Sequence, residues 1–181
     1  MHGHVMSFLR GQKALYPENF RPHCRVLELG SRDINGSPRS VCEGVSEYIG
    51  IDFHGGKGVD IAGVAHHVIA ERDLKGFDLI VSTEMLEHDP YWEDTIKAAV
   101  GALADGGLLL ITCASKKRGE HNLEDSPEPG YYRGLDPGEI VAVLNRYGSW
   151  EGIVGILDRH DLDTFVVAKA FPPTSDDADG S

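Results

Sequence analysis

Short apolar runs alternate with amphipathic segments along this chain. The runs are rich in β-branched residues, and the one from Phe77 to Ser82 is apolar almost throughout. Such runs are typical of parallel strands that are covered on both faces of a sheet. Seven of them are predicted to be strands: Cys24–Leu29, Glu47–Asp52, Val59–Gly63, Phe77–Ser82, Leu108–Cys113, Trp150–Leu157 and Thr164–Ala170.

Helices are predicted in three places between these runs. Ser37-Pro38 supplies an N-cap and a first-turn proline for a short helix. A longer helix is expected over Trp92–Leu103, because Pro90 prevents the residue before it from continuing a helix begun earlier. Another is expected over Asp136–Tyr147, again with proline in its first turn. No element is assigned before Cys24, and the first residues are expected to be mobile.

The order of these elements predicts an α/β fold with a Rossmann-like, doubly wound sheet that is mostly parallel. The last two strands are separated only by a short turn, so they are expected to form an antiparallel hairpin at the sheet edge. The chain has 181 residues, which suits one domain over residues 1–171. Residues 172–181, PPTSDDADGS, have the composition of a disordered acidic tail.

Composition narrows the partners and the location. The formal net charge of −12 opposes binding to duplex nucleic acid, which requires lysine and arginine to neutralise phosphates. No apolar run approaches the roughly 20 residues of a membrane span, and no continuous apolar signal region begins the chain. Cys24, Cys42 and Cys113 lie in or beside apolar stretches without paired spacing. We therefore expect reduced, packed thiols in a cytoplasmic protein.

Polar residues gather at the carboxyl ends of the predicted strands, where open α/β sheets bind ligands. Four segments there, V-L-E-L-G-S, Y-I-G-I-D, F-D-L-I-V-S-T-E-M-L-E-H and D-G-G-L-L-L-I-T, lie in order between Val26 and Thr112. Their order and spacing resemble the successive motifs of class I S-adenosylmethionine-dependent methyltransferases. The resemblance implies a methyltransferase with S-adenosylmethionine as its cofactor.

The resemblance also implies cofactor-binding roles. Glu28 would orient the turn and the methionine end of the cofactor, Gly30 would let the backbone come close, and Asp52 would accept both ribose hydroxyls. A structural ion pair for Glu28 and a helix N-cap for Asp52 are the alternatives. The full implied set is Glu28, Gly30, Ser31, Asp52, Phe53, Asp60, Ser82 and Glu84.

Two features depart from the family pattern. Arg32 and Ile34 stand where the family repeats glycine, so the turn must differ in detail. The acidic residue that often contacts adenine would fall near Val64, and Asp60 or nearby backbone groups are expected to replace it. A dinucleotide fingerprint is excluded, because Arg32 and Asn35 occupy the positions of its second and third glycines.

The segment Thr83–His88 carries the candidate catalytic chemistry. If one helical turn follows the strand, Glu84, Glu87 and His88 share a face and suit a divalent cation such as Mg²⁺, Mn²⁺ or Zn²⁺. The segment is similar to that of ubiquinone-pathway O-methyltransferases and of small-RNA 3′-terminal 2′-O-methyltransferases, which use metal. His121 is a candidate fourth ligand. Two alternatives stay open: His88 as a general base with Glu87 and no metal, and a structural role.

The long polar loop Ser115–Leu135 is expected to shape the acceptor site, since loops of this length are usually functional. Its second half looks like the P-x-Y-Y-R substrate segment of many small-molecule members. Tyr131, Tyr132 and Arg133 would present aromatic faces and a cation to an acceptor, or would only pin the loop. Lys116–Arg118 is interpreted as a solvated charge run or as a site for one phosphate.

The sequence favours methyl transfer to oxygen in a small-molecule acceptor, by a protein that could be a homodimer. Methylation of a nucleic-acid end at the 2′-oxygen is the second hypothesis, favoured by Lys116–Arg118 and opposed by the net charge. A module that binds the cofactor without turnover is the third, because the altered glycine turn allows it.

Overall fold

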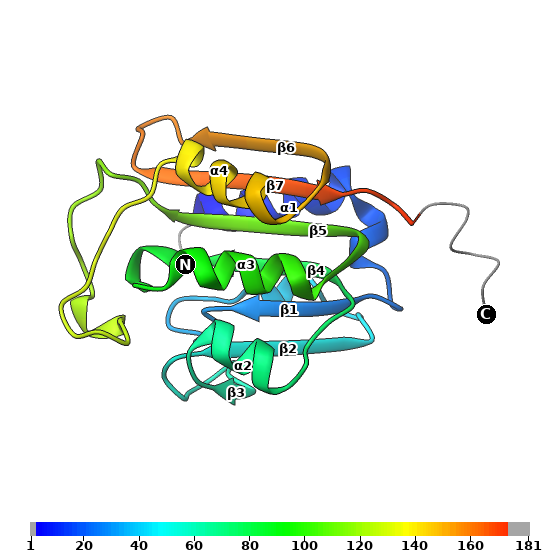
Figure 1. Ribbon diagram of the computed structural model, residues 1–181, viewed down its shortest axis with the longest axis horizontal. Helices are drawn as coiled ribbons and strands as arrows, with labels where there is room; N and C mark the ends of the chain where they lie inside the picture. Colours follow the sequence, from blue (N-terminus) through cyan, green and yellow to red (C-terminus); the bar gives the residue numbers. More distant parts are fainter. Residues whose placement is uncertain (1–2, 174–181) are drawn as a thin grey trace.

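The computed structural model describes residues 3–173 and contains one seven-stranded sheet in the order β3-β2-β1-β4-β5-β7-β6 (Figure 1). Pairing is parallel except at β7, which is antiparallel to both of its neighbours. The fold and the C-terminal edge hairpin predicted from the sequence are thereby confirmed. The strands are β1 Arg25–Leu29, β2 Glu47–Asp52, β3 Ile61–Ala62, β4 Phe77–Thr83, β5 Leu103–Ala114, β6 Trp150–Leu157 and β7 Asp163–Ala170.

Helices cover both faces of this sheet (Figure 1). Helices α2, α3 and α4 pack on one face, and α1 packs on the other. The α-helices are α1 Gly3–Leu15, α2 Ala65–Glu71, α3 Trp92–Ala102 and α4 Pro137–Tyr147. Short 3₁₀ turns are η1 Pro17–Phe20, η2 Pro38–Ser40, η3 Leu86–His88 and η4 Leu123–Asp125.

Local sequence signals predicted helices α3 and α4 correctly but did not reveal α1 and α2. Helix α4 begins with the capping box of Asp136 and Glu139, as the Asp-Pro signal indicates. The short helix expected after Ser37 is the 3₁₀ turn η2, capped by the Ser37 hydroxyl. Helices α1 and α2 were not predicted, and the expectation of a mobile N-terminus was wrong for α1. Its fully buried residues are only Val5 and Leu9, so its apolar face is too narrow to stand out in the sequence.

Each strand sends alternate side chains to the two faces. In β1, Leu27 and Leu29 join the cluster under α2, α3 and α4, whereas Val26 joins the cluster under α1. The β4 and β5 side chains are buried on both faces, as their continuous apolar runs indicate. The helices packed on the two faces hold the carboxyl ends of β1, β2 and β4 together at one end of the sheet.

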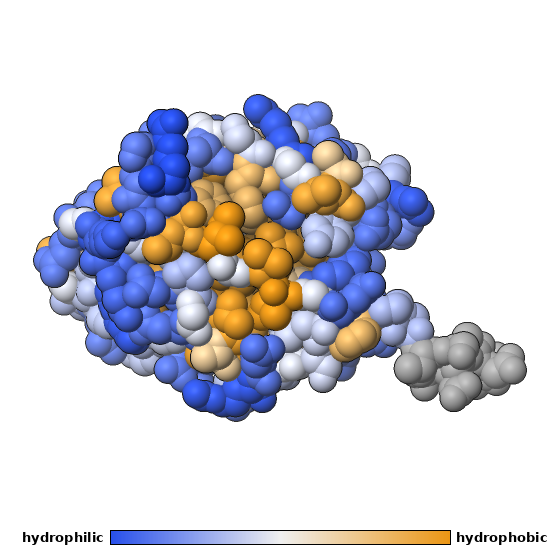
Figure 2. All heavy atoms as spheres, turned by 90° about the horizontal axis from the view of Figure 1, so that it is seen from above, coloured by the Kyte–Doolittle hydropathy of each residue, from blue (hydrophilic) through white to orange (hydrophobic). Residues whose placement is uncertain are grey.

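Strand β6 forms an open edge of the sheet. Figure 2, which views the molecule from the β6 side, shows apolar side chains gathered on this surface. Val154 and Ile156 of β6 are 58% and 55% exposed. Edge strands with exposed apolar side chains are available to pair with other chains.

The remaining predictions concern the cysteines, membrane spans and the C-terminal tail. All three cysteines are buried free thiols. No helix within residues 3–173 is long and apolar enough to cross a membrane. Apart from Pro172 and Pro173, the predicted acidic tail lies outside the described residues, so the tail and the domain boundaries stay predictions.

Replacing Leu27 by alanine is expected to lower the free energy of unfolding by about 2–5 kcal/mol, because the truncation leaves a cavity in a fully buried site. Urea denaturation followed by circular dichroism measures the change. The matched control is Leu15→Ala at a position that is 70% exposed, where we expect a change within about 0.5 kcal/mol. Equal changes in the two variants would contradict this placement of the core.

Candidate functional site

Two cavities meet at the carboxyl ends of β1, β2 and β4. The first is lined by charged and amide side chains, among them Glu28, Arg32, Asn35, Glu84 and Arg118. The second is more apolar and is lined in part by Phe53, Val64, Ala65 and Pro127. Both cavities are bordered by Gly30, Asp52, Met85, His88 and Asp125, so these five residues mark the junction. An elongated ligand with one polar and one apolar end would suit the pair.

Gly30 is essential to the turn after β1. Its φ is 81°, a left-handed conformation that favours glycine, and its N–H donates to the Ile51 carbonyl at 2.9 Å. A Cβ at this position would lie 2.5 Å from the Cβ of Met85. The turn after β1 therefore packs directly on the turn after β4, and the role predicted for Gly30 has a steric basis.

Arg32, which replaces a family glycine, connects the turn to the long loop. Its guanidinium forms an ion pair with Asp125, and its backbone N–H donates to Asp52 Oδ2 at 3.1 Å. Further along the turn, Asp33 Oδ1 accepts the Gly36 N–H at 2.8 Å. The turn thus differs from a glycine-rich one because a side chain, rather than a close backbone approach, occupies this position.

Asp52 lies at the junction of the cavities. Its two oxygens accept backbone N–H groups of Arg32 and His54, the latter at 2.9 Å. In the described chain, the first helix after Asp52 is α2, which begins only at Ala65. Asp52 therefore does not cap a helix, and the N-cap alternative does not hold. Because each carboxylate oxygen has a second lone pair, Asp52 keeps acceptor capacity toward the cleft.

Glu28 is a buried acid on the wall of the first cavity. It is 1% exposed and accepts a hydrogen bond of 2.7 Å from the Tyr48 hydroxyl. Burial raises the pKa of Glu28 to about 7, although the Tyr48 hydrogen bond opposes this shift. Its partner here is a neutral hydroxyl, which is not the cation that the ion-pair alternative requires.

Of the other predicted cofactor residues, two line a cavity and three do not. Phe53 lines the second cavity and Glu84 the first. Ser31 and Ser82 are buried and line neither cavity. Asp60 also lines neither cavity. Its carboxylate accepts the N–H of Gly50 at 2.7 Å and pairs with Arg39.

The expected helical turn after β4 does not form as predicted. Glu84 has a φ of 54° and is followed by the 3₁₀ turn Leu86–His88, so i and i+3 spacing no longer places it on the face of Glu87 and His88. Its carboxylate instead contacts Arg118 Nη1 at 2.9 Å and the Thr112 hydroxyl at 3.1 Å. The prediction that Glu84 converges with Glu87 and His88 was therefore wrong.

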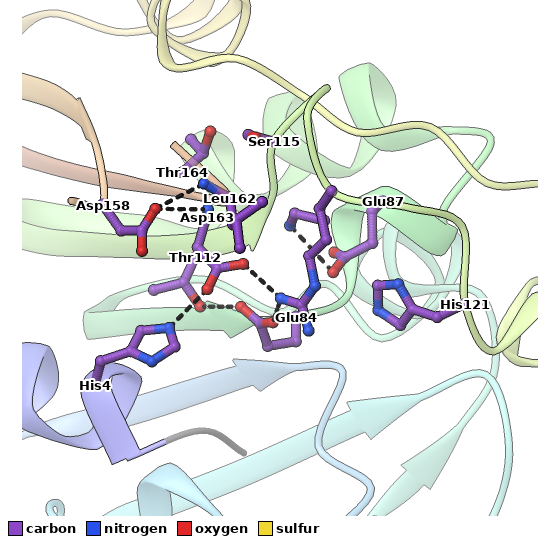
Figure 3. A network of polar contacts seen from close by, with 12 residues as sticks. His4, Glu84, Glu87, Thr112, Ser115, His121, Asp158, Leu162, Asp163 and Thr164 are labelled. Atoms are coloured by element: carbon purple, nitrogen blue, oxygen red, sulfur yellow. Dashed lines mark hydrogen bonds and ion pairs between the residues drawn. The ribbon is translucent and has the colours of Figure 1, made fainter. Parts of the chain in front are cut away.

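A different group of possible metal ligands forms beside the junction. Glu87, His88 and His121 each offer a ligand atom, and these atoms lie within 4.8 Å of one another. The ring of His88 is 5.2 Å from that of His121 and 5.4 Å from that of Tyr132, measured between centroids. Figure 3 shows His121 beside Glu87, with the long loop bringing it to the end of β4.

This group, which we call the Glu-His cluster (Glu87, His88 and His121), is largely buried. Glu87 is 0% exposed: Oε1 accepts the Ala114 N–H at 3.2 Å, and Oε2 has no hydrogen-bond partner within the described residues. Burial, and next the nearby Glu84, raise the pKa of Glu87. His88 Nδ1 also lacks a partner there, and burial lowers the pKa of His88 to about 4. At neutral pH, His88 is therefore an uncharged imidazole with a free ring nitrogen.

The basic run Lys116–Arg118 is not simply solvated. Arg118 bridges Glu84 and Asp163, and its contact with Asp163 is 2.5 Å. Lys116 and Lys117 pair with acidic side chains on α4 and before β7, respectively. Helix α1 joins the same network, because His4 lies 2.6 Å from Asp163. The network fixes one end of the long loop to β4 and β7.

Of the three predicted acceptor residues, Tyr132 is the one whose side chain contacts the Glu-His cluster, through the rings of His88 and His121. Its hydroxyl is buried without a partner in the described chain, and burial raises its pKa to about 12. The guanidinium of Arg133 pairs with Glu139 at 2.7 Å, while the backbone N–H of Arg133 donates to the backbone carbonyl of Glu87 at 2.8 Å. None of these three residues lines either cavity, and the contacts of Arg133 fit the pinning alternative.

Sequence reasoning missed several residues of the cleft, and three of them have a clear structural part. Met85 supports Gly30, Arg118 closes the first cavity beside Glu84, and Asp125 stands at the junction. The only available signal for Asp125 was its position in a long polar loop, and such a signal does not single out one acid among several.

Alanine at Gly30 is expected to destabilise the fold more than alanine at Gly44. Both glycines have positive φ, 81° and 88°, so each variant carries a strain of about 1–2 kcal/mol. Only Gly30 adds a clash with Met85, because nothing lies within 4 Å of a Cβ at Gly44. The clash should add about 1–3 kcal/mol to the loss in unfolding free energy, measured by urea denaturation. Equal losses in the two variants would mean that the turn after β1 can move away from Met85 at no energetic cost.

Comparison with known proteins agrees with this geometry. A family model described as a methyltransferase domain matches residues 2–147. No curated protein matches the sequence significantly. The match covers the strands, turns and loop that build the two cavities, so it spans the whole candidate site.

Several solved structures share the fold. A SAM dependent methyltransferase from Archaeoglobus fulgidus aligns with a TM-score of 0.64 at 14% identity, over 90% of this chain and 93% of that chain. The YcgJ protein from Bacillus subtilis aligns at 0.60 and 12%, over 96% and 100%. A 1,6-didemethyltoxoflavin-N1-methyltransferase from Burkholderia thailandensis, solved with S-adenosylhomocysteine, aligns at 0.57 and 16%, over 90% and 78%. At such identities these likenesses show the fold.

Proposed function

This chain belongs to the methyltransferase domain family, and from that membership we propose that it transfers the methyl group of S-adenosylmethionine to a hydroxyl of a small molecule. The family supplies the reaction class, but not the atom that receives the methyl group. The name of the Burkholderia relative assigns its methyl group to nitrogen, so similar folds serve different acceptors. The acceptor must be argued from the site.

The two cavities suit the two ends of the cofactor. The apolar second cavity, with Phe53 and Val64, fits an adenine ring. The polar first cavity, with Glu28 and Asn35, fits the charged methionine end. Asp52 at the junction is then in place to accept the ribose hydroxyls, and the sulfur with its methyl group lies near the same junction.

The observation that carries the proposal is the position of His88. This residue borders both cavities and is also a member of the Glu-His cluster. In an in-line displacement the acceptor oxygen forms a bond to the methyl carbon, the carbon–sulfur bond breaks, and the hydroxyl proton must leave. A hydroxyl beside His88 would have both a route for its proton and access to the methyl group.

A divalent cation fits the Glu-His cluster. Glu87 Oε2 and His88 Nδ1 are buried polar atoms without partners in the described chain, which is costly unless a ligand satisfies them. Two imidazoles and a carboxylate suit Zn²⁺ or Mn²⁺ better than Mg²⁺, which prefers oxygen ligands. Such an ion would lower the pKa of an acceptor hydroxyl. Without it, the neutral imidazole of His88 is the candidate general base.

Charge and pairing favour a small acceptor over a nucleic-acid end. The net charge is −12, and the basic residues Lys116–Arg118 already contact acidic side chains. A phosphate would have to compete with those carboxylates. Tyr132, next to the Glu-His cluster, offers an aromatic surface to a flat or apolar acceptor.

Association and location stay predictions. For a homodimer, the exposed edge of β6 is the available surface, because edge strands pair readily with a second copy. Analytical ultracentrifugation would decide it. The cytoplasmic location is consistent with three unpaired thiols.

Wild-type protein is expected to bind S-adenosylmethionine, and Asp52→Asn is expected to weaken binding by about 10- to 100-fold, since hydrogen bonds to a charged acceptor contribute about 1.5–3 kcal/mol. Isothermal titration calorimetry measures both affinities. Asp105→Asn, at the opposite end of the sheet before the buried part of β5, is the control and should bind as the wild type does. Unchanged affinity in Asp52→Asn would overturn the ribose assignment. Binding without turnover of any hydroxyl acceptor would favour the inactive module.

His121→Ala is expected to weaken Mn²⁺ or Zn²⁺ binding by at least about tenfold, because it removes one of three protein ligands. Titration of each ion, with and without S-adenosylmethionine, measures the change. His67→Ala, an exposed histidine on α2, is the matched control and should leave ion affinity unchanged. If the wild-type protein binds neither ion, the metal role is excluded and His88 remains as the candidate base.

A further inference from the structure

The long loop crosses the cofactor cleft and is fastened on both sides of it. Arg118 contacts Glu84 at the end of β4, and the Glu124 carbonyl lies 3.2 Å from His54 Nε2 after β2. Directly after the second anchor, Asp125 pairs with Arg32 of the turn after β1. The loop therefore places Arg118, His121, Asn122 and Asp125 on the wall of the first cavity.

Asp125 is the acidic residue of this loop that borders both cavities. Its side chain borders both cavities and is only 20% exposed, although its neighbour Glu124 is exposed. Asp52, the other carboxylate at the junction, has both oxygens engaged by backbone N–H groups. The partner of Asp125 is instead the side chain of Arg32, so no backbone N–H holds the Asp125 carboxylate in the described contacts.

We propose that Asp125 distinguishes the charged methyl donor from its neutral product by facing the sulfur at the cavity junction. The inference rests on the proposed function, in which the cofactor spans both cavities with its sulfur near their meeting point. The donor carries a sulfonium, and the product, S-adenosylhomocysteine, carries an uncharged thioether. A carboxylate close to that sulfur attracts the donor and loses the attraction when the methyl group has left.

A consequence is that the loop responds to the reaction. While the donor is bound, the sulfonium adds an attraction to the anchors that hold the loop over the cleft. After transfer, only the Arg32 ion pair and the other anchors remain, so the loop opens more readily and the product leaves. The same side chain would then serve both donor selection and product release.

Variants of Arg32 distinguish this role from an ion pair that only fastens the loop. If the Arg32–Asp125 ion pair only fastens the loop, then removing either partner should weaken donor and product equally. If Asp125 senses the sulfonium, Arg32→Ala keeps the carboxylate and therefore keeps the preference for the donor. Asp125→Asn retains the size of the side chain and removes only the charge.

The test compares affinities of the 181-residue chain for S-adenosylmethionine and S-adenosylhomocysteine by isothermal titration calorimetry. Asp125→Asn is expected to weaken S-adenosylmethionine binding by about tenfold, or 1.4 kcal/mol, and S-adenosylhomocysteine binding by less than about twofold. An unreactive analogue with an ammonium group in place of the sulfonium should behave as the donor does. Glu124→Gln, the same charge change one residue away, is expected to change neither affinity.

Each outcome decides between the possibilities. A preference for the donor that falls in Asp125→Asn but persists in Arg32→Ala supports the inference. Equal weakening of both ligands in both variants, or an unchanged preference in Asp125→Asn, overturns it and leaves the ion pair as a latch. Failure of the wild-type protein to bind either ligand would overturn the proposed function instead. Thermal unfolding of each variant verifies that the fold is intact.

Discussion

The parallel pairing of β1 with β4 is the constraint on which the site depends. Because both strands run in the same direction, their carboxyl ends emerge side by side, and the turns that follow must share one small volume. Gly30 and Met85 show how tight this sharing is, since no Cβ can be added between them. Four of the five junction residues lie on or after these neighbouring strands: Gly30 follows β1, Asp52 ends β2, and Met85 and His88 follow β4.

Burial of polar groups next to that junction has an energetic cost that a folded core alone would not justify. The carboxyl group of Glu87 and the ring of His88 each keep an unpartnered atom in the described chain, and both groups have shifted pKa values. Strained or unsatisfied positions of this kind concentrate at functional sites. The long loop increases the cost by adding His121 and Tyr132, and it also supplies Asp125 and Arg118. This loop therefore carries most of what distinguishes the site from a bare family core.

Local patterns specified most of the architecture. Continuous apolar runs gave β4 and β5, because strands buried on both faces have no polar positions to interrupt them. The Asp-Pro signal gave α4, because capping depends only on neighbouring residues. The pattern did not reveal α1, whose face contributes only two fully buried side chains, or the short helix α2. Marginal helices depend on packing against the sheet, which no local window contains.

By itself, the sequence determined the fold class, the C-terminal edge hairpin and the end of the sheet at which a ligand is expected to bind, since hydrophobic periodicity and family motifs are local properties. It also singled out Glu28, Gly30, Asp52 and His88, which all line the cleft. Only the tertiary structure decided that Glu84 turns away to Arg118 and that His121 and Asp125 come in from a distant loop. A positive φ at one residue and the path of a long loop set those positions, and both depend on contacts between segments far apart in the chain.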